Sequence, residues 1–580
     1  MALLIALAPA ADAVAAGSPH PPPGSNALPT PDPVSPIIFN PRSMTKPPQG
    51  FAVSAAQAIR AADRTRIAKR VRAHYSGITV RPFITPIGLP DYPYWHWDLF
   101  YNSHGKHVAE VEVGAAGGVL RVASGPDVGW GIVRGDPGVL GGKLNAPYVW
   151  LPLCLLFVVP FFDPRRRRRL LHLDLAVLLL FGASHYFFNL GKPAVSVPLV
   201  YPFLVYVLVR MVLAALRPRQ RSGELVPYAS TPFLMTGVAL LVVMRIAFGI
   251  AGSHTLDISA AGVVGADRVW HGLPLYVDND YHGDTYGPVN YLAYVPFERI
   301  APSDAHGVDP AAKMATLTFD LLIVLGLYLL GRQTRAGPRG HRLGVILAYA
   351  WVAYPYTALV IASNTNDALV PLFVIYALLA ARWAGARGAL AALAGLAKFA
   401  PLLLAPTLLA GRRAFRGRGA IFAAAAFALV SVALIAPFWP AGGLRELWNT
   451  TLGFQAHRTS PVTLWGRHPD LTWLQTVADV VAVAIAIAAA FVPRRRTTGQ
   501  LAALCGATLA AAQIAGNYWM YFYLAWLAPF VFIALFEEYP VLGPVQASVT
   551  RSLRKPVSTS QPESVTTTRS SILTPSDSGT

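Results

Sequence analysis

A polar segment from residue 253 to residue 313 holds the residue types in this chain that are best suited to chemistry. It lies between two apolar runs and contains a Tyr-Gly-Pro-Val-Asn-Tyr run at 286–291. Among its acids and histidines are Asp257, Asp267, His271, Asp278, Asp280, His282 and Asp284. An aspartate just beyond a membrane helix can act as a general base toward a hydroxyl group, although many such acids are only solvated. The acids of the loop could also bind a divalent cation through oxygen, but a hydrated loop is the more ordinary reading.

Composition indicates what surrounds this segment. The chain has 580 residues, of which 54% are hydrophobic and 13% charged, whereas soluble domains are about 25% charged. We therefore expect a polytopic membrane protein. The net charge of +19 comes from short Lys and Arg clusters between apolar runs, where basic residues orient helices in a bilayer, so nucleic acid is not an expected partner. Cys154 and Cys505 form no metal or redox pattern.

About thirteen candidate membrane helices can be found, some of them short for the roughly 20 residues that a span needs. They lie near 147–162, 170–188, 196–216, 230–252, 313–331, 342–361, 368–384, 388–398, 400–411, 419–438, 472–493, 499–516 and 518–537. With this count, six arginine clusters fall on one side, which the positive-inside rule makes cytoplasmic. These clusters lie at 165–169, 217–221, 332–342, 382–387, 412–418 and 494–496.

This topology makes further predictions. The run 286–300 must be a short juxtamembrane or re-entrant element, and 388–411 a hairpin bent around Lys398 and Pro401. Asp257, the polar turn 364–367 and the pair 457–458 then share the outer face. We also expect an ion pair between Arg245 and Asp320, because unpaired charges inside apolar helices are costly, and a pair between Asp174 and the arginine cluster that ends at Arg169. No role is predicted for His185.

The N-terminal quarter of the chain has a different sequence pattern. Residues 1–16 resemble a secretory signal or an anchor, 17–48 read as a disordered linker, and 51–146 as an exported α+β module. In that module we expect one amphipathic helix over 51–77 and an antiparallel sheet from residue 94. The pattern resembles a PepSY-type domain. His96, His104 and His107 could be ligands, but solvated histidines on exposed strand ends are the expected reading. Residues 539–580 are expected to form a disordered cytoplasmic tail.

Several motifs in order carry a second resemblance. Asp257 is followed by Ala260-Ala261 and by Gly-Leu-Pro-Leu-Tyr at 272–276. The later motifs are Tyr-Gly-Pro-Val-Asn-Tyr at 286–291, Val-Pro-Phe at 295–297, Ser-Asn-Thr-Asn-Asp at 363–367, Gly-Leu-Ala-Lys-Phe-Ala-Pro at 395–401, Phe-Gln-Ala-His-Arg at 454–458 and Ser-Pro-Val-Thr-Leu-Trp-Gly at 460–466. Over about 230–538 the chain resembles membrane glycosyltransferases of the GT-C type, in particular the polyprenyl-phosphate-mannose-dependent mannosyltransferases of family 87. Residues 147–229 then resemble an added three-helix segment.

The resemblance implies an inverting sugar transfer, with mannose the expected sugar, from a polyprenyl-phosphate donor to an envelope glycolipid or glycan on the outer face of the plasma membrane. Asp257 would be the general base, assisted by His457, while Lys398 and Arg458 would bind the donor phosphate. Snorkelling and rim positions are the alternatives for these two cations. Substrate-binding candidates are Tyr276, Tyr286, Tyr291, Asn366, Asp367 and Trp465, and the aromatic ones suit an interfacial belt equally well.

No bound metal or cofactor is implied, apart from the open possibility of a divalent cation. No nucleotide-binding motif follows a strand, so a lipid phosphate is the expected donor. Two other classes compete with the glycosyltransferase. A solute transporter or lipid flippase would use the same charges along a pathway, but we find no convincing internal repeat of the kind that many transporters show. A regulatory protein would act through its N-terminal module.

Overall fold

The computed structural model describes residues 40–86, 95–125, 128, 131–133, 140–253, 255–276, 285–303, 308–413, 417–458 and 460–541. Most of these residues are helical, and the strands lie in one small N-terminal sheet. The mainly α fold with a small α+β module is therefore confirmed at this level. The predicted segment 1–16, the predicted linker 17–48 up to residue 39, the acids at 278–284 and the predicted tail 539–580 from residue 542 onward lie outside the described residues.

The N-terminal module has two helices and four strands. They are α1 (Ala55–Asp63), α2 (Arg66–His74), β1 (Ile78–Pro86), β2 (Trp95–Ser103), β3 (Lys106–Gly114) and β4 (Val119–Ser124). The prediction of one helix over 51–77 was wrong, because the helix breaks at Thr65. The Thr65 hydroxyl donates to the carbonyl of Ala62 at 2.7 Å and accepts from the backbone N–H of Ala68 at 3.2 Å, so it caps a new helix.

The sheet is an antiparallel meander in the order β1-β2-β3-β4, as the alternating sequence predicts. One face carries fully buried Trp97, Leu99 and Tyr101, and it packs with α1 and α2. His96 is buried, so the expectation of a solvated side chain was wrong there. His104 lies exposed at a tight turn, with φ of 48°. The described residues contain no group of three or more metal-ligating side chains.

The membrane region is one helical bundle with a continuous apolar core. Among the described residues, seven helices are long and apolar enough to cross a membrane. They are α4 (Leu170–Asn189), α5 (Pro193–Leu216), α6 (Thr231–Ala251), α11 (Val308–Thr334), α17 (Arg418–Ile435), α21 (Thr472–Phe491) and α22 (Thr498–Ala515). This length criterion supports a membrane-spanning protein, whereas the predicted total of about thirteen helices includes shorter ones.

Shorter helices complete the bundle. They are α3 (Pro147–Val158), α12 (Gly337–Ala353), α13 (Pro355–Ala362), α14 (Leu369–Leu379), α15 (Ala384–Ala397), α16 (Ala405–Ala410) and α23 (Leu524–Glu537). The run 342–361 is not a single straight span, because α12 and α13 meet at an angle of 57° just before Pro355, where proline removes a backbone donor. The hairpin around Lys398 is confirmed: a guanidinium N–H of Arg387, at the start of α15, donates to the carbonyl of Leu409 in α16 at 3.1 Å.

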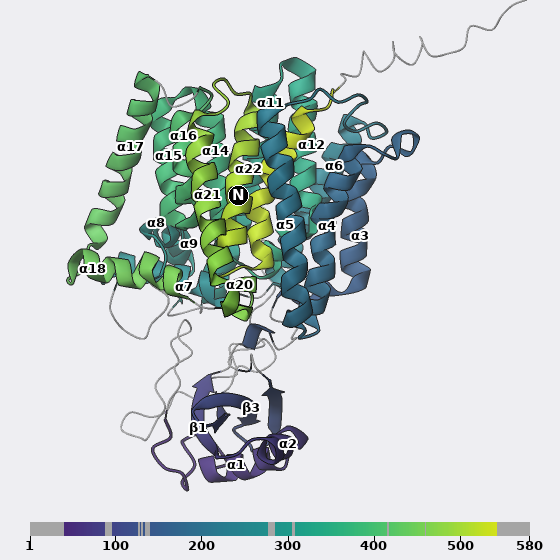
Figure 1. Cartoon of the computed structure of the whole chain (residues 1–580). Coiled ribbons are helices and arrows are strands. Elements are labelled where there is room, and N and C mark those ends of the chain that lie inside the picture. Colours follow the sequence, from purple (N-terminus) through teal and green to yellow (C-terminus); the bar gives the residue numbers. More distant parts are fainter. Residues whose placement is uncertain are drawn as a thin grey trace, which may run out of the picture. The chain divides into compact units, whose positions relative to one another are not determined.

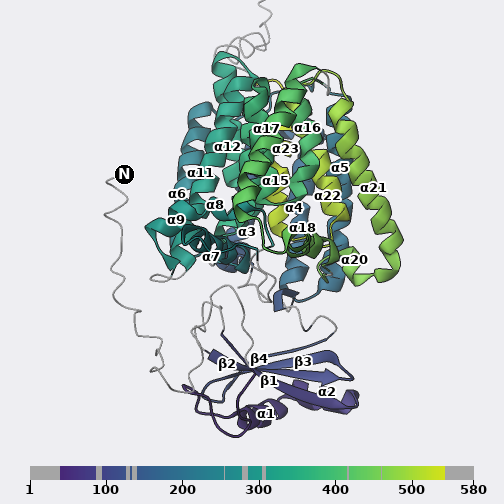
Figure 2. The same cartoon turned by 90° about the vertical axis from the view of Figure 1, so that its left-hand side faces the viewer.

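Small helices gather at one end of the bundle (Figures 1 and 2). They are α7 (Asp257–Trp270), α8 (Pro288–Leu292), α9 (Val295–Ile300), α18 (Gly443–Trp448), α19 (Phe454–His457) and α20 (Leu464–Arg467). The run 286–300 is thus two short helices and no span, as predicted. In Figure 1, α18 lies across the direction of α17 and the neighbouring long helices.

The arginine clusters meet through contacts at one end of the bundle, as the topology predicts. The backbone carbonyl of Glu224 accepts a hydrogen bond from Arg169 at 2.9 Å, and the carboxylate of Glu224 accepts one from Arg342 at 3.0 Å. Arg335 donates to the carbonyl of Glu537 at 3.1 Å. The other two links join Arg412 to Thr498 at 2.7 Å and Arg496 to the carbonyl of Gly411 at 3.3 Å.

The charges inside the helices are paired. Arg245 and Asp320 form the predicted ion pair at 2.6 Å. Asp174 does not pair with the cluster at Arg169, because α5 supplies a closer cation: Arg210 lies 3.1 Å from its carboxylate. Arg210 also binds Glu538 at 2.7 Å. The tail was predicted to begin at residue 539, but Tyr539 is buried. The first residues beyond Glu538 therefore belong to the packed bundle.

Candidate functional site

Asp257 opens a helix at the end of the bundle that holds the small helices. It is the first residue of α7, its side chain is exposed, and its carboxylate accepts the backbone N–H of Ile258 at 2.8 Å. A carboxylate is favoured there by the free N–H groups and the dipole of the helix. The residue before it, Leu256, donates its N–H to the carbonyl of Ser363 at 3.3 Å. Asp257 is therefore a fixed, solvent-facing acid beside the polar turn 363–367.

The polar turn is entirely buried. Asn364 holds the left-handed φ of 42°, which asparagine tolerates better than most residues, and its amide donates to the hydroxyl of Ser253 at 2.9 Å. Asn366 donates to the side chain of Asn290 in α8 at 2.8 Å. Asn366 is fully buried, so it joins α8 to the turn and has no surface for direct contact with a substrate.

Asp367 and Lys398 form a buried ion pair. The Nζ of Lys398 lies 2.6 Å from Oδ1 of Asp367, which also accepts the indole N–H of Trp526 at 3.0 Å. Asp367 is 0% exposed and Lys398 6% exposed. Three rings surround the ammonium, with centroids 5.2 Å (Trp526), 5.6 Å (Tyr523) and 5.7 Å (Tyr286) from Nζ. Asp367 thus contacts the lysine directly, where the sequence predicted a contact with substrate.

Arg458 lies over a fourth aromatic ring. Its guanidinium carbon is 4.0 Å from the ring centroid of Tyr518. Burial raises the pKa of Tyr518 to about 12, against the opposing charge and hydrogen bond of Arg458, and the carboxylates of Asp257 and Asp367 add to the rise. Burial also raises the pKa of Tyr286, with Asp257 the next largest cause. These couplings bring Asp257, Arg458 and the Asp367–Lys398 pair into one electrostatic neighbourhood around two tyrosines.

His457 precedes Arg458 on an exposed turn of helix. Its Nδ1 lies 2.8 Å from the carbonyl of Gly453, the last residue of a π-helical turn at Asn449–Gly453. A carbonyl can only accept, so Nδ1 carries the proton and Nε2 is the ring atom that can take up another. A π-helical turn is rare and occurs often at functional sites. His457 lies next to Arg458 in sequence, but among the described residues no hydrogen bond or ion pair joins it to Asp257.

The remaining predicted aromatic residues support the site and do not line it. The hydroxyl of Tyr276 donates to the carbonyl of Tyr286 at 2.9 Å, and that of Tyr291 accepts the N–H of Tyr286 at 3.2 Å. Both are buried, and together they fix the backbone of Tyr286. Trp465 is buried as well and donates to the carbonyl of Ile514 at 2.8 Å, so it packs the base of a loop.

Sequence reasoning missed Tyr518, Tyr523 and Trp526. The run 518–526 reads Tyr-Trp-Met-Tyr-Phe-Tyr-Leu-Ala-Trp, a density of aromatic residues that could have identified it. It was interpreted only as the start of the last helix. In the structure, these three rings lie around Lys398 and Arg458, although residues 518–526 are distant from both cations in the sequence.

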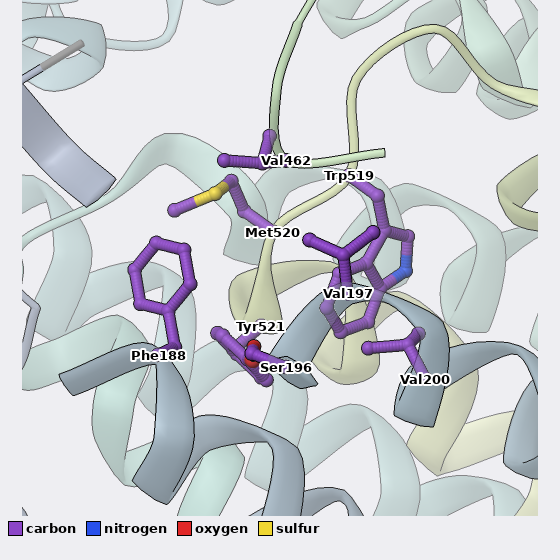
Figure 3. A pocket seen from close by; sticks show the side chains of 8 residues that line it. All are labelled: Phe188, Ser196, Val197, Val200, Val462, Trp519, Met520 and Tyr521. Atoms are coloured by element: carbon purple, nitrogen blue, oxygen red, sulfur yellow. The ribbon is translucent and has the colours of Figure 1, made fainter. Parts of the chain in front are cut away.

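A small cavity lies beside this aromatic run (Figure 3). Figure 3 shows side chains from α4, α5 and two loops around it, among them Phe188, Trp519 and Tyr521. The volume open to the centre of a water molecule is about 10 Å³. This is close to the ~10–15 Å³ that a cavity needs to hold one ordered water. The cavity is thus too small for a sugar or an isoprene unit.

No family model, curated protein or solved structure matches this chain.

Proposed function

We propose that this chain is a membrane glycosyltransferase that moves a sugar, with mannose the leading candidate, from a polyprenyl-phosphate donor to an envelope glycolipid or glycan. The observation that carries the proposal is an exposed carboxylate, Asp257, that shares one electrostatic neighbourhood with Arg458 around Tyr286 and Tyr518, while Nζ of Lys398 lies 5.7 Å from the ring centroid of Tyr286. Inverting transfer needs such a set: a base for the acceptor hydroxyl and fixed positive charge for the departing phosphate.

The roles follow from where each group lies. Asp257 takes the proton of the acceptor hydroxyl as its oxygen bonds to the anomeric carbon. The bond from that carbon to the phosphate oxygen breaks, and its electron pair leaves with the lipid phosphate. Arg458 and Lys398 stabilise the charge that develops on the phosphate. His457 supplies a second basic nitrogen near Arg458, and Tyr286 and Tyr518 offer rings on which a sugar can stack.

The side of the membrane is part of the proposal. The arginine clusters lie together at one end of the bundle, and basic ends favour the cytoplasm. The site then faces outward, where lipid-linked sugars replace nucleotide sugars as donors. The acceptor would be a lipid or glycan of the envelope, and the plasma membrane is the expected location.

Replacement of Asp257 tests the proposal. We expect Asp257→Asn to lower transfer from polyprenyl-phosphate mannose in isolated membranes by about 10²–10⁴-fold, the usual contribution of a general base. Asp309→Asn is the matched control, because Asp309 is also an exposed acid in the first turn of a helix, and it should transfer at the normal rate. Undiminished transfer by Asp257→Asn would remove Asp257 from the mechanism.

One observation favours the alternative of a transporter or lipid flippase. The bundle contains the sharp bend between α12 and α13, and broken helices are frequent in transporters. The bend leads to the same buried turn, so a moving pathway there would use Asp367 and Lys398 as gating charges. Uptake of a solute or lipid by the purified protein without a sugar-transfer product would favour this alternative.

A further inference from the structure

Two carboxylates in the bundle have the same kinds of partner. Asp320 binds Arg245 at 2.6 Å and accepts the indole N–H of Trp351 at 2.8 Å. Asp367 binds Lys398 at 2.6 Å and accepts the indole N–H of Trp526 at 3.0 Å. Each is therefore a buried set of one acid, one cation and one indole. The two sets differ in how completely their polar atoms are satisfied.

The Asp320 set is saturated. Oδ2 of Asp320 accepts from Arg245 at 3.0 Å, and Oδ1 accepts from both Arg245 and Trp351. The remaining N–H groups of Arg245 donate to the carbonyl of Val352 at 3.4 Å and to the hydroxyl and carbonyl of Thr357 at 3.3 and 3.0 Å. Such a set stabilises the packing of α6 against α11 and α12, and it offers nothing to a ligand.

The Asp367 set is open. Oδ2 of Asp367 has no hydrogen-bond partner among the described residues. Within the same part of the chain, the ammonium of Lys398 makes one hydrogen bond, to Oδ1, although an ammonium has three donors. Its other neighbours are the rings of Tyr286, Tyr523 and Trp526, which attract the cation but satisfy its N–H groups poorly. Tyr286 and Tyr523 are only partly buried, so this is the side from which a ligand could approach.

We propose that Asp367 is a positioning residue for donor binding: it balances the charge of Lys398 and holds Nζ in place, while two N–H groups stay available for the phosphate of the lipid. This inference rests on the proposed function and deepens it. A lysine with no counter-charge would be costly to bury, so Lys398 needs Asp367 before the donor binds. Trp526 fixes Oδ1, and the three rings prevent Nζ from turning away.

The experiment compares the two sets. Asp367→Asn, Lys398→Met and the double variant are made beside Asp320→Asn, Arg245→Met and their double variant. Two properties are measured on the full chain in detergent: the Tm, and the rise of Tm on addition of polyprenyl phosphate. The second readout needs no sugar transfer. The KM values for donor and acceptor are then measured in liposomes.

Single variants in both sets should lower the Tm, because each leaves a buried charge unpaired, and each double variant should recover much of it. The Asp320/Arg245 double variant should keep the phosphate-induced rise of Tm and the donor KM of the unaltered chain. The Asp367/Lys398 double variant should lose the rise and raise the donor KM by about 10-fold or more, because the loss of even one charge-assisted hydrogen bond has this effect. Its acceptor KM should stay within about twofold.

The inference is overturned if the Asp367/Lys398 double variant binds polyprenyl phosphate like the unaltered chain, because the pair is then only structural. Should the single variants fail to fold, Asp367→Glu decides the matter. It keeps the charge but displaces Nζ, so we expect weaker phosphate binding at a similar Tm, and unchanged binding overturns the inference. An unaltered chain that binds polyprenyl phosphate but transfers no sugar contradicts the proposed function and leaves the role of Asp367 standing.

Discussion

At the scale of single residues, the site depends on how one arginine is held. The guanidinium of Arg458 stacks on Tyr518, whose hydroxyl also hydrogen-bonds to it. The sequence predicted Arg458 as a phosphate ligand but could not reveal this partner, because Tyr518 lies 60 residues further on and no local pattern joins them. The partner of Lys398 was hidden for the same reason, since Asp367 was interpreted as a contact of the substrate.

Tyr518→Phe tests this contact. The variant keeps the ring but loses the hydroxyl, so transfer should fall about fivefold, equivalent to ~1 kcal/mol for one hydrogen bond. The pKa of Tyr518 is raised to about 12, so the hydroxyl stays protonated up to pH 10, where a tyrosine of ordinary pKa would be half ionised. The ratio of unaltered to variant rates should therefore be equal at pH 7 and pH 10. A ratio that differs between pH 7 and pH 10 would show that Tyr518 ionises earlier.

At the scale of elements, the site depends on the close approach of α8 to the end of α15. A Cβ on Gly287 would meet the carbonyl of Leu396 well inside van der Waals contact, so only glycine allows Tyr286 to reach the ammonium of Lys398. Most helices were predictable from apolar runs and the hairpin from Lys398 and Pro401. The bend at Pro355 and the break at Thr65 were not, because apolar and amphipathic patterns continue through both.

Gly287→Ala should separate these elements. We expect a loss of at least about tenfold in transfer, because the backbone must move by about 1 Å to admit the Cβ, and this displaces Tyr286 from both cations. Gly385→Ala is the control. Gly385 lies in α15, where an added Cβ would meet open space and alanine has a higher helix propensity than glycine. Equal activity of the two variants in the membrane assay would show that the approach of α8 is not required.

At the scale of the whole molecule, the account depends on two unlike ends of the bundle. The clustering of arginines was predictable from sequence because basic loops alternate with apolar helices. The composition of the opposite end was only partly predictable, since its residues come from six separate segments. Accessibility to a membrane-impermeant thiol reagent in intact cells tests the sides.

Cysteines are introduced singly at positions 257 and 167, with Cys154 and Cys505 replaced by alanine. We expect the reagent to label position 257 in intact cells, and position 167 only after the membrane is opened. Arg167 is exposed in the 165–169 cluster, so it is a fair control for access. Labelling of 167 but not of 257 from outside would invert the topology and place the site where nucleotide sugars could serve as donors.

The central claim is that the chain itself transfers sugar from a lipid phosphate. The most direct measurement uses purified protein in liposomes, with polyprenyl-phosphate mannose as donor and a glycolipid extract of the envelope as acceptor, and detects the mannosylated product by mass spectrometry. We predict product from the lipid-linked donor with the unaltered chain, and none from a nucleotide sugar or with Asp257→Asn. Product formed equally well by Asp257→Asn, or no product with any lipid-linked sugar while a solute or lipid is moved across the bilayer, would contradict the account.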